Sequence, residues 1–142
     1  MRLAPGLERD AIACRRWVDR VEERAWGLGR EGGLYSDGTY FLVVALQEAL
    51  TNALRHGKSA DGRGAVEVTL AMEPGEVLAI TVRDRGRGFD PSRVPDPLRP
   101  ECLVKASGRG IFYMRRFVDR VSFSFPCGGG TIVRLEKHLP ER

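Results

Sequence analysis

The spacing of the apolar residues changes along the chain, and this change restricts the fold more than any other feature of the sequence. In the first part, apolar residues recur at intervals of three and four, as on one side of a helix: Leu7, Ala11, Cys14, Val18, Val21, Ala25 and Leu28. From Val66 onward, apolar and polar residues alternate, as in strands with one buried face. Two helices followed by strands favour helices packed on one face of a sheet.

Glycine, proline and capping residues mark the ends of these segments. The glycines between positions 27 and 33 are expected to end the first helix, and a second helix is expected from Ser36 or Asp37 to His56. Further segments, in chain order, are strands at 66–72 and 78–82, a short helix at about 110–118, and strands at 121–125 and 131–135. We therefore predict an α/β two-layer sandwich with a mainly antiparallel mixed sheet.

Length and composition indicate one compact globular domain covering residues 1–142. The longest apolar run, Phe41 to Leu46, is too short to span a bilayer, and no basic start followed by an apolar core begins the chain. We therefore expect a cytoplasmic protein without a membrane segment. Cys14, Cys102 and Cys127 are widely spaced and are expected to be reduced thiols, not zinc ligands or disulfide partners.

The positive charge is concentrated in one stretch. Residues 83–120 hold ten basic and five acidic residues, which suggests an anionic ligand or an acidic partner. Direct nucleic-acid binding is not expected, because this stretch is rich in glycine and proline and has few interleaved aromatic residues. Residues 85–107 carry four of the eight prolines and form a long irregular segment, which is typical of a functional loop.

Polar residues recur every four positions on the second predicted helix. Glu48 and Asn52 therefore lie on one helix face, one turn apart, among small alanines. A solvated stripe is the simpler interpretation for this helix alone. The alternative is that the carboxylate acts as a base and the amide oxygen as a Mg²⁺ ligand, since Mg²⁺ commonly takes only one or two protein oxygens beside phosphates and water.

Asp84 ends a strand in phase with its buried residues. It should point toward the core, where a carboxylate needs a hydrogen-bond donor. That donor is either local, from Arg83, Arg85 or a loop amide, or belongs to a ligand, such as the amino group of adenine. Gly86 and Gly88 follow and permit close approach of the backbone.

A glycine pair precedes the short predicted helix. Gly108, Arg109 and Gly110 could bind phosphate through backbone N–H groups, the helix dipole and a guanidinium. A simple helix-entry turn explains the same residues equally well.

Taken in order, these segments resemble the nucleotide-binding motifs of the GHKL, or Bergerat-fold, ATPases. The ordered set is Glu48 to Gly57 with Asn52 inside it, Asp84 to Phe89, Gly108 to Gly110, and Gly130-Thr131. Within that superfamily, the short length and the stretch Gly108 to Asp119 resemble the anti-sigma-factor serine/threonine kinases. The resemblance covers roughly residues 7–137 and implies a Bergerat-type ATP-binding fold.

The resemblance implies a role for each motif residue. Asn52 would bind Mg²⁺ and Glu48 would be the general base. Asp84 would accept from the adenine amino group of ATP or ADP, with a water held by Thr131. The remaining implied contacts are Gly86 and Gly88 beneath the base, Gly108, Arg109 and Gly110 at the phosphates, and an ATP lid over about 90–107.

Three functional hypotheses follow. The first is an enzyme, a protein serine/threonine kinase that sequesters a sigma factor and phosphorylates an anti-anti-sigma partner with the STAS fold; the family also implies a homodimer. The second is a nucleotide-dependent binding module without significant kinase activity. The third, a histidine-kinase catalytic domain, fits poorly, because no helical hairpin with a phospho-acceptor histidine precedes residue 36.

Overall fold

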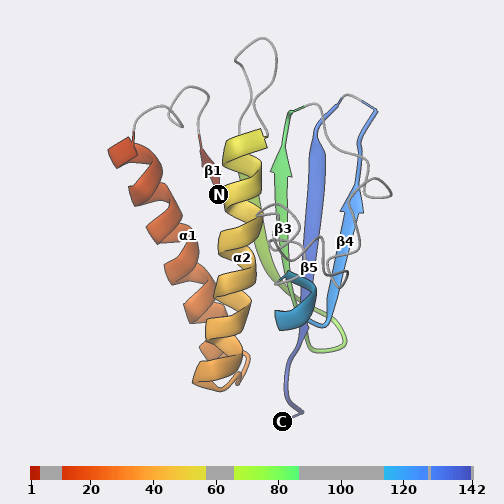
Figure 1. Ribbon diagram of the computed structural model, residues 1–142. Helices are drawn as coiled ribbons and strands as arrows, with labels where there is room; N and C mark the ends of the chain where they lie inside the picture. Colours follow the sequence, from red (N-terminus) through yellow and green to blue (C-terminus); the bar gives the residue numbers. More distant parts are fainter. Residues whose placement is uncertain (4–10, 57–65, 87–113, 128, 142) are drawn as a thin grey trace, which may run out of the picture.

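The computed structural model describes residues 1–3, 11–56, 66–86, 114–127 and 129–141. In chain order the elements are β1 (Arg2–Leu3), α1 (Ala11–Glu31), α2 (Ser36–His56), β2 (Val66–Glu73), β3 (Val77–Asp84), β4 (Arg120–Ser124) and β5 (Thr131–His138). The strands form one sheet in the order β1-β2-β3-β5-β4, and each of these four pairs is antiparallel. Both helices lie on the same face of this sheet (Figure 1). The predicted two-layer sandwich is confirmed.

The second helix and the hairpin lie where the sequence places them. α2 begins at Ser36 and is described to His56, and β2 and β3 are joined by the turn that contains Pro74 and Gly75. The helical residues 114–117 fall inside the short helix expected at about 110–118. The strand pattern therefore carried enough information to locate each described strand after residue 60.

α1 ends within the predicted group of glycines, at its last two members. The helix continues through Gly27 and Gly29 to Glu31 and stops at Gly33, whose φ is +80°. The Leu34 N–H donates to the Gly29 carbonyl (2.9 Å) and the Gly33 N–H to the Arg30 carbonyl (3.0 Å), which is a Schellman motif. Earlier glycines are tolerated in the helix because each costs only about 1 kcal/mol relative to alanine.

The N-terminal strand was not expected from the sequence. Arg2 and Leu3 pair with Glu67 and Val66 of β2. The Val68 N–H also donates to the Met1 carbonyl at 2.6 Å. Two residues are too few for an alternating pattern, so only the pairing itself reveals β1.

The core lies between the helices and the sheet. It is formed by aliphatic residues of both helices and by alternate residues of the three central strands: Val21, Ala25, Leu28, Leu42, Leu46, Leu50, Val68, Leu78, Ile80, Val82, Val133 and Leu135. Trp17 of α1 is also buried, at 3% exposure, although the predicted apolar stripe did not include it. This core fixes α2 against the sheet, and α2 carries two of the candidate site residues.

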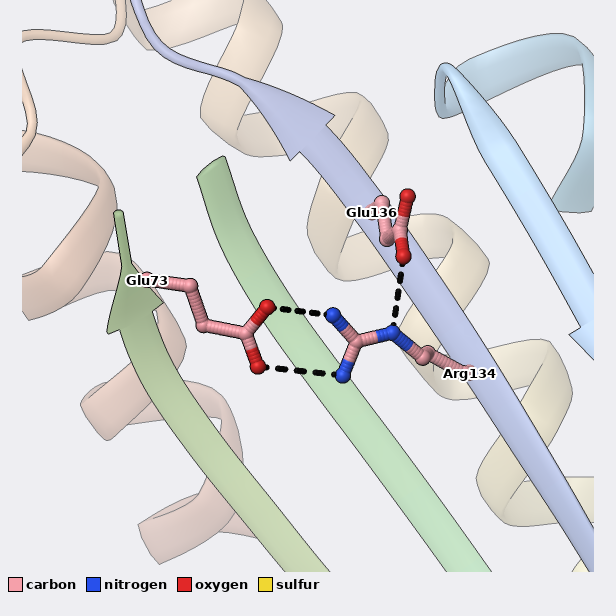
Figure 2. Close-up of polar contacts among 3 residues, drawn as sticks. All are labelled: Glu73, Arg134 and Glu136. Carbon is pink, nitrogen blue, oxygen red and sulfur yellow. Dashed lines mark hydrogen bonds and ion pairs between the residues drawn. The ribbon is translucent and has the colours of Figure 1, made fainter. Parts of the chain in front are cut away.

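The other face of the sheet carries an ion-pair network. Arg134 on β5 lies opposite Thr81 of β3, and its guanidinium crosses β3 to form a two-point contact with Glu73 of β2 (Figure 2). Its Nε also donates to Glu136 Oε1 at 2.7 Å. The hydrogen bond from Arg134 lowers the pKa of Glu73, and the bonds to Glu73 and Glu136 raise the pKa of Arg134.

The same network explains why Ala79 is only 3% exposed. This residue lies on the face without helices, between the level of Arg134 and that of Glu73 in the strand register. The long side chains that cross β3 shield it from water, as charged side chains with apolar stems often do.

Candidate functional site

Asp84 lies at the end of β3, on the helix-covered face of the sheet. It follows Leu78, Ile80 and Val82 in the same phase, and like them it is buried, at 8% exposure. The strand parity used in the sequence analysis therefore predicted the direction of this side chain correctly. A carboxylate in this position is costly to desolvate unless donors surround it.

One donor to this carboxylate is visible. The Gly86 N–H donates to Asp84 Oδ1 at 2.9 Å, across a turn that directly follows the strand. This is one of the local partners considered from the sequence, a loop amide. It orients the carboxylate and holds the buried Gly86 close to it.

Thr131 lies directly beside Asp84. The two residues are register partners in the β3–β5 pair, so their side chains point to the same face, and Thr131 is 3% exposed. The resemblance to the GHKL ATPases implied one site for these two residues, although 46 residues lie between them in the chain. The sheet pairing places them side by side, as the resemblance implies.

Gly130 allows the start of β5 to approach the end of β3 closely. Its φ is +93°, and a Cβ at this position would lie 2.2 Å from the Asp84 carbonyl oxygen and 3.0 Å from the Arg85 Cα. Both neighbours are backbone atoms that cannot rotate away. The turn before β5 can therefore contact the end of β3 only with glycine at this position.

Glu48 and Asn52 are half-buried on α2. They lie one turn apart, next to the buried Ala45, Ala49 and Ala53, so the backbone around them is closely packed. The C-terminal end of α2, the end of β3 and the start of β5 all lie at one end of the molecule (Figure 1). The fold therefore brings the half of α2 with Glu48 and Asn52 to the same end as Asp84 and Thr131.

Gln47 has a different environment from its neighbour Glu48. It is exposed, and its Nε2 donates to Glu22 Oε1 of α1 at 3.0 Å. The polar stripe is thus divided. Gln47 joins the two helices, while Glu48 and Asn52 lie further round the circumference of α2.

A Mg²⁺ ion fits these residues in type and number. The described residues contain no group of three or more His, Cys, Asp or Glu side chains suited to a metal. Mg²⁺ bound with phosphates needs only one or two protein oxygens, and the half-buried amide of Asn52 could supply one. The metal role of Asn52 stays a prediction.

Several predicted site residues lie outside the described part of the chain. These are Gly88, Gly108, Arg109 and Gly110, together with the expected lid over about 90–107. Their roles stay predictions, as do those of Glu48, Asn52, Asp84, Gly86 and Thr131.

An aromatic contact near α2 was not foreseen. Phe41 of α2 stacks on Phe117 with ring centroids 4.8 Å apart and an interplanar angle of 16°. Tyr40 meets Phe41 edge to face at 5.7 Å. The sequence signal is the exposed aromatic pair at the start of α2, which the apolar helix pattern concealed.

The fold and the site together define a class of nucleotide-binding protein. The sequence matches the family model of the histidine kinase-like ATPase domain over residues 8–137. The chain therefore belongs to the histidine kinase-like ATPase family. None of the helices among the described residues is long and apolar enough to cross a membrane.

Relatives at higher identity place the chain more narrowly, among anti-sigma F factors. The anti-sigma F factor of Geobacillus kaustophilus (strain HTA426) is 38% identical over 102 residues, which cover 69% of this chain and 68% of that protein. The anti-sigma F factor of Bacillus subtilis (strain 168) is 37% identical, with the same coverage. The family resemblance inferred from the motifs is thus confirmed.

Solved structures support the fold. The histidine kinase domain of the blue-light activated histidine kinase from Erythrobacter litoralis EL346 has a TM-score of 0.59 at 22% identity, covering 89% of this chain and 65% of that chain. Full-length ShkA in complex with AMPPNP also has a TM-score of 0.59, at 17% identity, covering 99% of this chain and 32% of that one.

Proposed function

We propose that this protein is an ATP-dependent serine/threonine kinase that also sequesters a sigma factor. Its acceptor would be an anti-anti-sigma protein with the STAS fold. The observation that carries the proposal is the placement of buried Asp84 and Thr131 at the same end of the fold as Glu48 and Asn52. The anti-sigma F factor relatives support the choice of partners.

The adenine end of the nucleotide would lie against the β3–β5 pair. Asp84 would accept from the amino group at purine position six, with a water held by Thr131, and Gly86 and Gly88 would leave room for the base. Guanine has a carbonyl at that position, so the same carboxylate would disfavour GTP. Gly108, Arg109 and Gly110 would bind the phosphates, and residues of about 90–107 would cover them.

The reaction would take place beside α2. Asn52 would hold the Mg²⁺ ion, which supplies neutralisation of phosphate charge. Glu48, one turn earlier on the same face, would accept the proton of the acceptor hydroxyl as the hydroxyl oxygen attacks the γ-phosphorus. The bond between the γ-phosphorus and the β–γ bridging oxygen would break, and ADP would leave. Phosphoryl transfer needs mainly positioning and charge stabilisation, which a rigid helix packed on the sheet provides.

Two further features belong to the proposal. Residues 1–142 would act as one ATPase domain, and the protein would form a homodimer, as the family resemblance implies. Neither direct binding of nucleic acid nor a membrane contact has a part in this function.

The decisive experiment is phosphotransfer from radiolabelled ATP and Mg²⁺ to purified STAS proteins of the same genome. Glu48→Gln keeps the shape of the side chain and removes its basicity, so single-turnover transfer should fall about 10²–10⁴-fold while ATP affinity is retained. Asn52→Ala should weaken the Mg²⁺ dependence of nucleotide binding. The matched control is Glu67→Gln, which changes an exposed carboxylate of β2 and should leave both measurements unchanged.

Two outcomes would change the assignment. If Glu48→Gln transfers phosphate as fast as the unmodified protein, Glu48 is not the base even if the kinase assignment holds. If the unmodified protein binds ATP and a sigma factor but phosphorylates no STAS protein, the alternative is correct, and the chain is a nucleotide-dependent binding module without significant kinase activity.

A further inference from the structure

We propose that a surface of aromatic and basic side chains next to Glu48 docks the acceptor protein. This inference rests on the proposed kinase function. The surface, called here the aromatic–basic surface, consists of Tyr40 and Phe41 of α2, of Phe117, which stacks on Phe41, and of the exposed Arg115 and Arg116 that precede Phe117 in the chain.

The aromatic side chains of α2 in this surface are exposed to solvent. Tyr40 is 55% exposed and Phe41 is 39% exposed. Phe41 nevertheless stacks on Phe117, which joins the start of α2 to residues 114–117. Clustered exposed aromatic side chains usually mark a surface that binds another molecule, because exposing a large apolar area to water is unfavourable.

The surface is held rigidly before any partner arrives. Met114 and Val118 on either side of it are buried, at 0% and 6% exposure. The Asp119 N–H donates to the Glu136 carbonyl (2.9 Å), and its carboxylate accepts from the His138 N–H (2.6 Å). A surface fixed in this way loses little conformational entropy on binding.

The positive charge of the aromatic–basic surface favours an acidic partner. Arg115 and Arg116 are exposed and form no ion pair with any residue that the structure describes. The neighbouring Asp119 lies 3.9 Å from the Lys137 ammonium and is already engaged with β5. Arginine and aromatic residues are also the side chains that most often dominate binding energy at protein interfaces.

The position of this surface favours the acceptor as its occupant. Phe41 and Glu48 are seven residues apart, which is two turns along one line of α2, or about 10 Å. A standard protein interface covers about 800 Å² on each partner, a disc of radius about 16 Å. An interface of this size centred near Glu48 therefore reaches Phe41 and the Phe117 ring that stacks on it.

The acceptor should present an apolar side chain bordered by carboxylates close to its phosphorylated hydroxyl. A second copy of this chain is the weaker candidate. A two-fold interface centred on this surface would bring Arg115 and Arg116 of both copies together, and like charges at an interface are unfavourable.

The test is steady-state phosphotransfer to the STAS protein that the kinase assay identifies, with acceptor concentration varied at saturating ATP and Mg²⁺. Tyr40→Ala and Arg116→Glu should each raise the KM for the acceptor at least ten-fold. The kcat at saturating acceptor and the affinity for ATP should stay within two-fold of the unmodified protein. Met72→Ala and Arg30→Glu are controls with similar chemistry on other parts of the surface and should leave all three values unchanged.

The outcomes separate this inference from the proposed function. If the unmodified protein phosphorylates the acceptor, and both surface variants do so with an unchanged KM, the docking surface is wrong and the kinase function stands. The same conclusion follows if the controls raise the KM as much as the surface variants do. If the unmodified protein phosphorylates no STAS protein, the proposed function fails and the docking surface fails with it.

Discussion

The two faces of the sheet each carry a carboxylate that accepts N–H donors, in very different surroundings. On the helix-covered face, Asp84 is 8% exposed and accepts from the backbone of Gly86. On the open face, the side chain of Glu73 is 39% exposed and accepts from the long side chain of Arg134. The Gly86 N–H that donates to Asp84 is a backbone group, whereas the donors to Glu73 belong to a side chain that water can replace.

This difference determines what each carboxylate can do. A buried acceptor without its donor costs about 1–3 kcal/mol, so the surroundings of Asp84 must be fixed by the fold. Exposed ion pairs typically contribute little, because water and salt screen them. The covered face is therefore suited to selective binding, and the open face to shielding Ala79 and holding neighbouring strands together.

The largest effect is expected where the backbone itself forms the site. Gly130→Ala would place a Cβ 2.2 Å from the Asp84 carbonyl oxygen, at a φ of +93°. We expect a loss of about 3 kcal/mol or more in the free energy of unfolding, from backbone strain and a clash that no side chain can relieve. Urea unfolding followed by circular dichroism measures it.

Gly75→Ala separates strain from the clash. Gly75 has a similar φ, +88°, but nothing lies within 4 Å of a Cβ built there. This variant should lose only about 1 kcal/mol. Equal losses in the two variants would mean that the close contact between Gly130 and Asp84 has no importance for stability.

A smaller effect is expected from changing the buried carboxylate alone. Asp84→Asn keeps an oxygen for the Gly86 N–H but replaces the other acceptor with a donor. ATP affinity should fall by about 1–3 kcal/mol, and the preference for ATP over GTP should shrink. Titration calorimetry with both nucleotides gives the two affinities.

The same exchange on the open face is the control for Asp84. Glu73→Gln removes an equivalent charge from the other side of the sheet and should leave ATP affinity within two-fold. Equal affinities of the unmodified protein for ATP and GTP would contradict the adenine role of Asp84.

The smallest effect concerns stability and pH at the open face. The hydrogen bond from Arg134 lowers the pKa of Glu73 below its ordinary value of 4.5. Glu73 therefore stabilises the folded state above that value, and this stabilisation is lost as the pH falls through the lowered pKa. The unfolding free energies of the unmodified protein and Glu73→Gln should differ at pH 7 and converge as the pH falls below the lowered pKa of Glu73.

Glu67→Gln is the control on the same strand, since Glu67 forms no ion pair with a described residue. Its difference from the unmodified protein should be smaller than that of Glu73→Gln at pH 7. A pH-independent difference for Glu73→Gln would show that the contact with Arg134 does not depend on the Glu73 charge.

The sequence alone determined the local structure and the direction of the buried side chains. Periods of 3.6 and 2 residues predicted α1, the β2–β3 hairpin and β5, because burial of one face imposes these periods wherever the segment packs. The same parity predicted that Asp84 points toward the core. The motif order also predicted the family, which the match over residues 8–137 confirms.

Only the tertiary structure decided which distant residues meet. Four such contacts produce no periodic pattern in the nearby sequence. They are the pairing of Thr131 with Asp84, the pairing of β1 with β2, the ion pair of Arg134 with Glu73, and the stacking of Phe41 on Phe117. Such contacts depend on strand order and on how helices lie across the sheet. These follow from the sum of many packing interactions, so neighbouring residues in the sequence do not encode them individually.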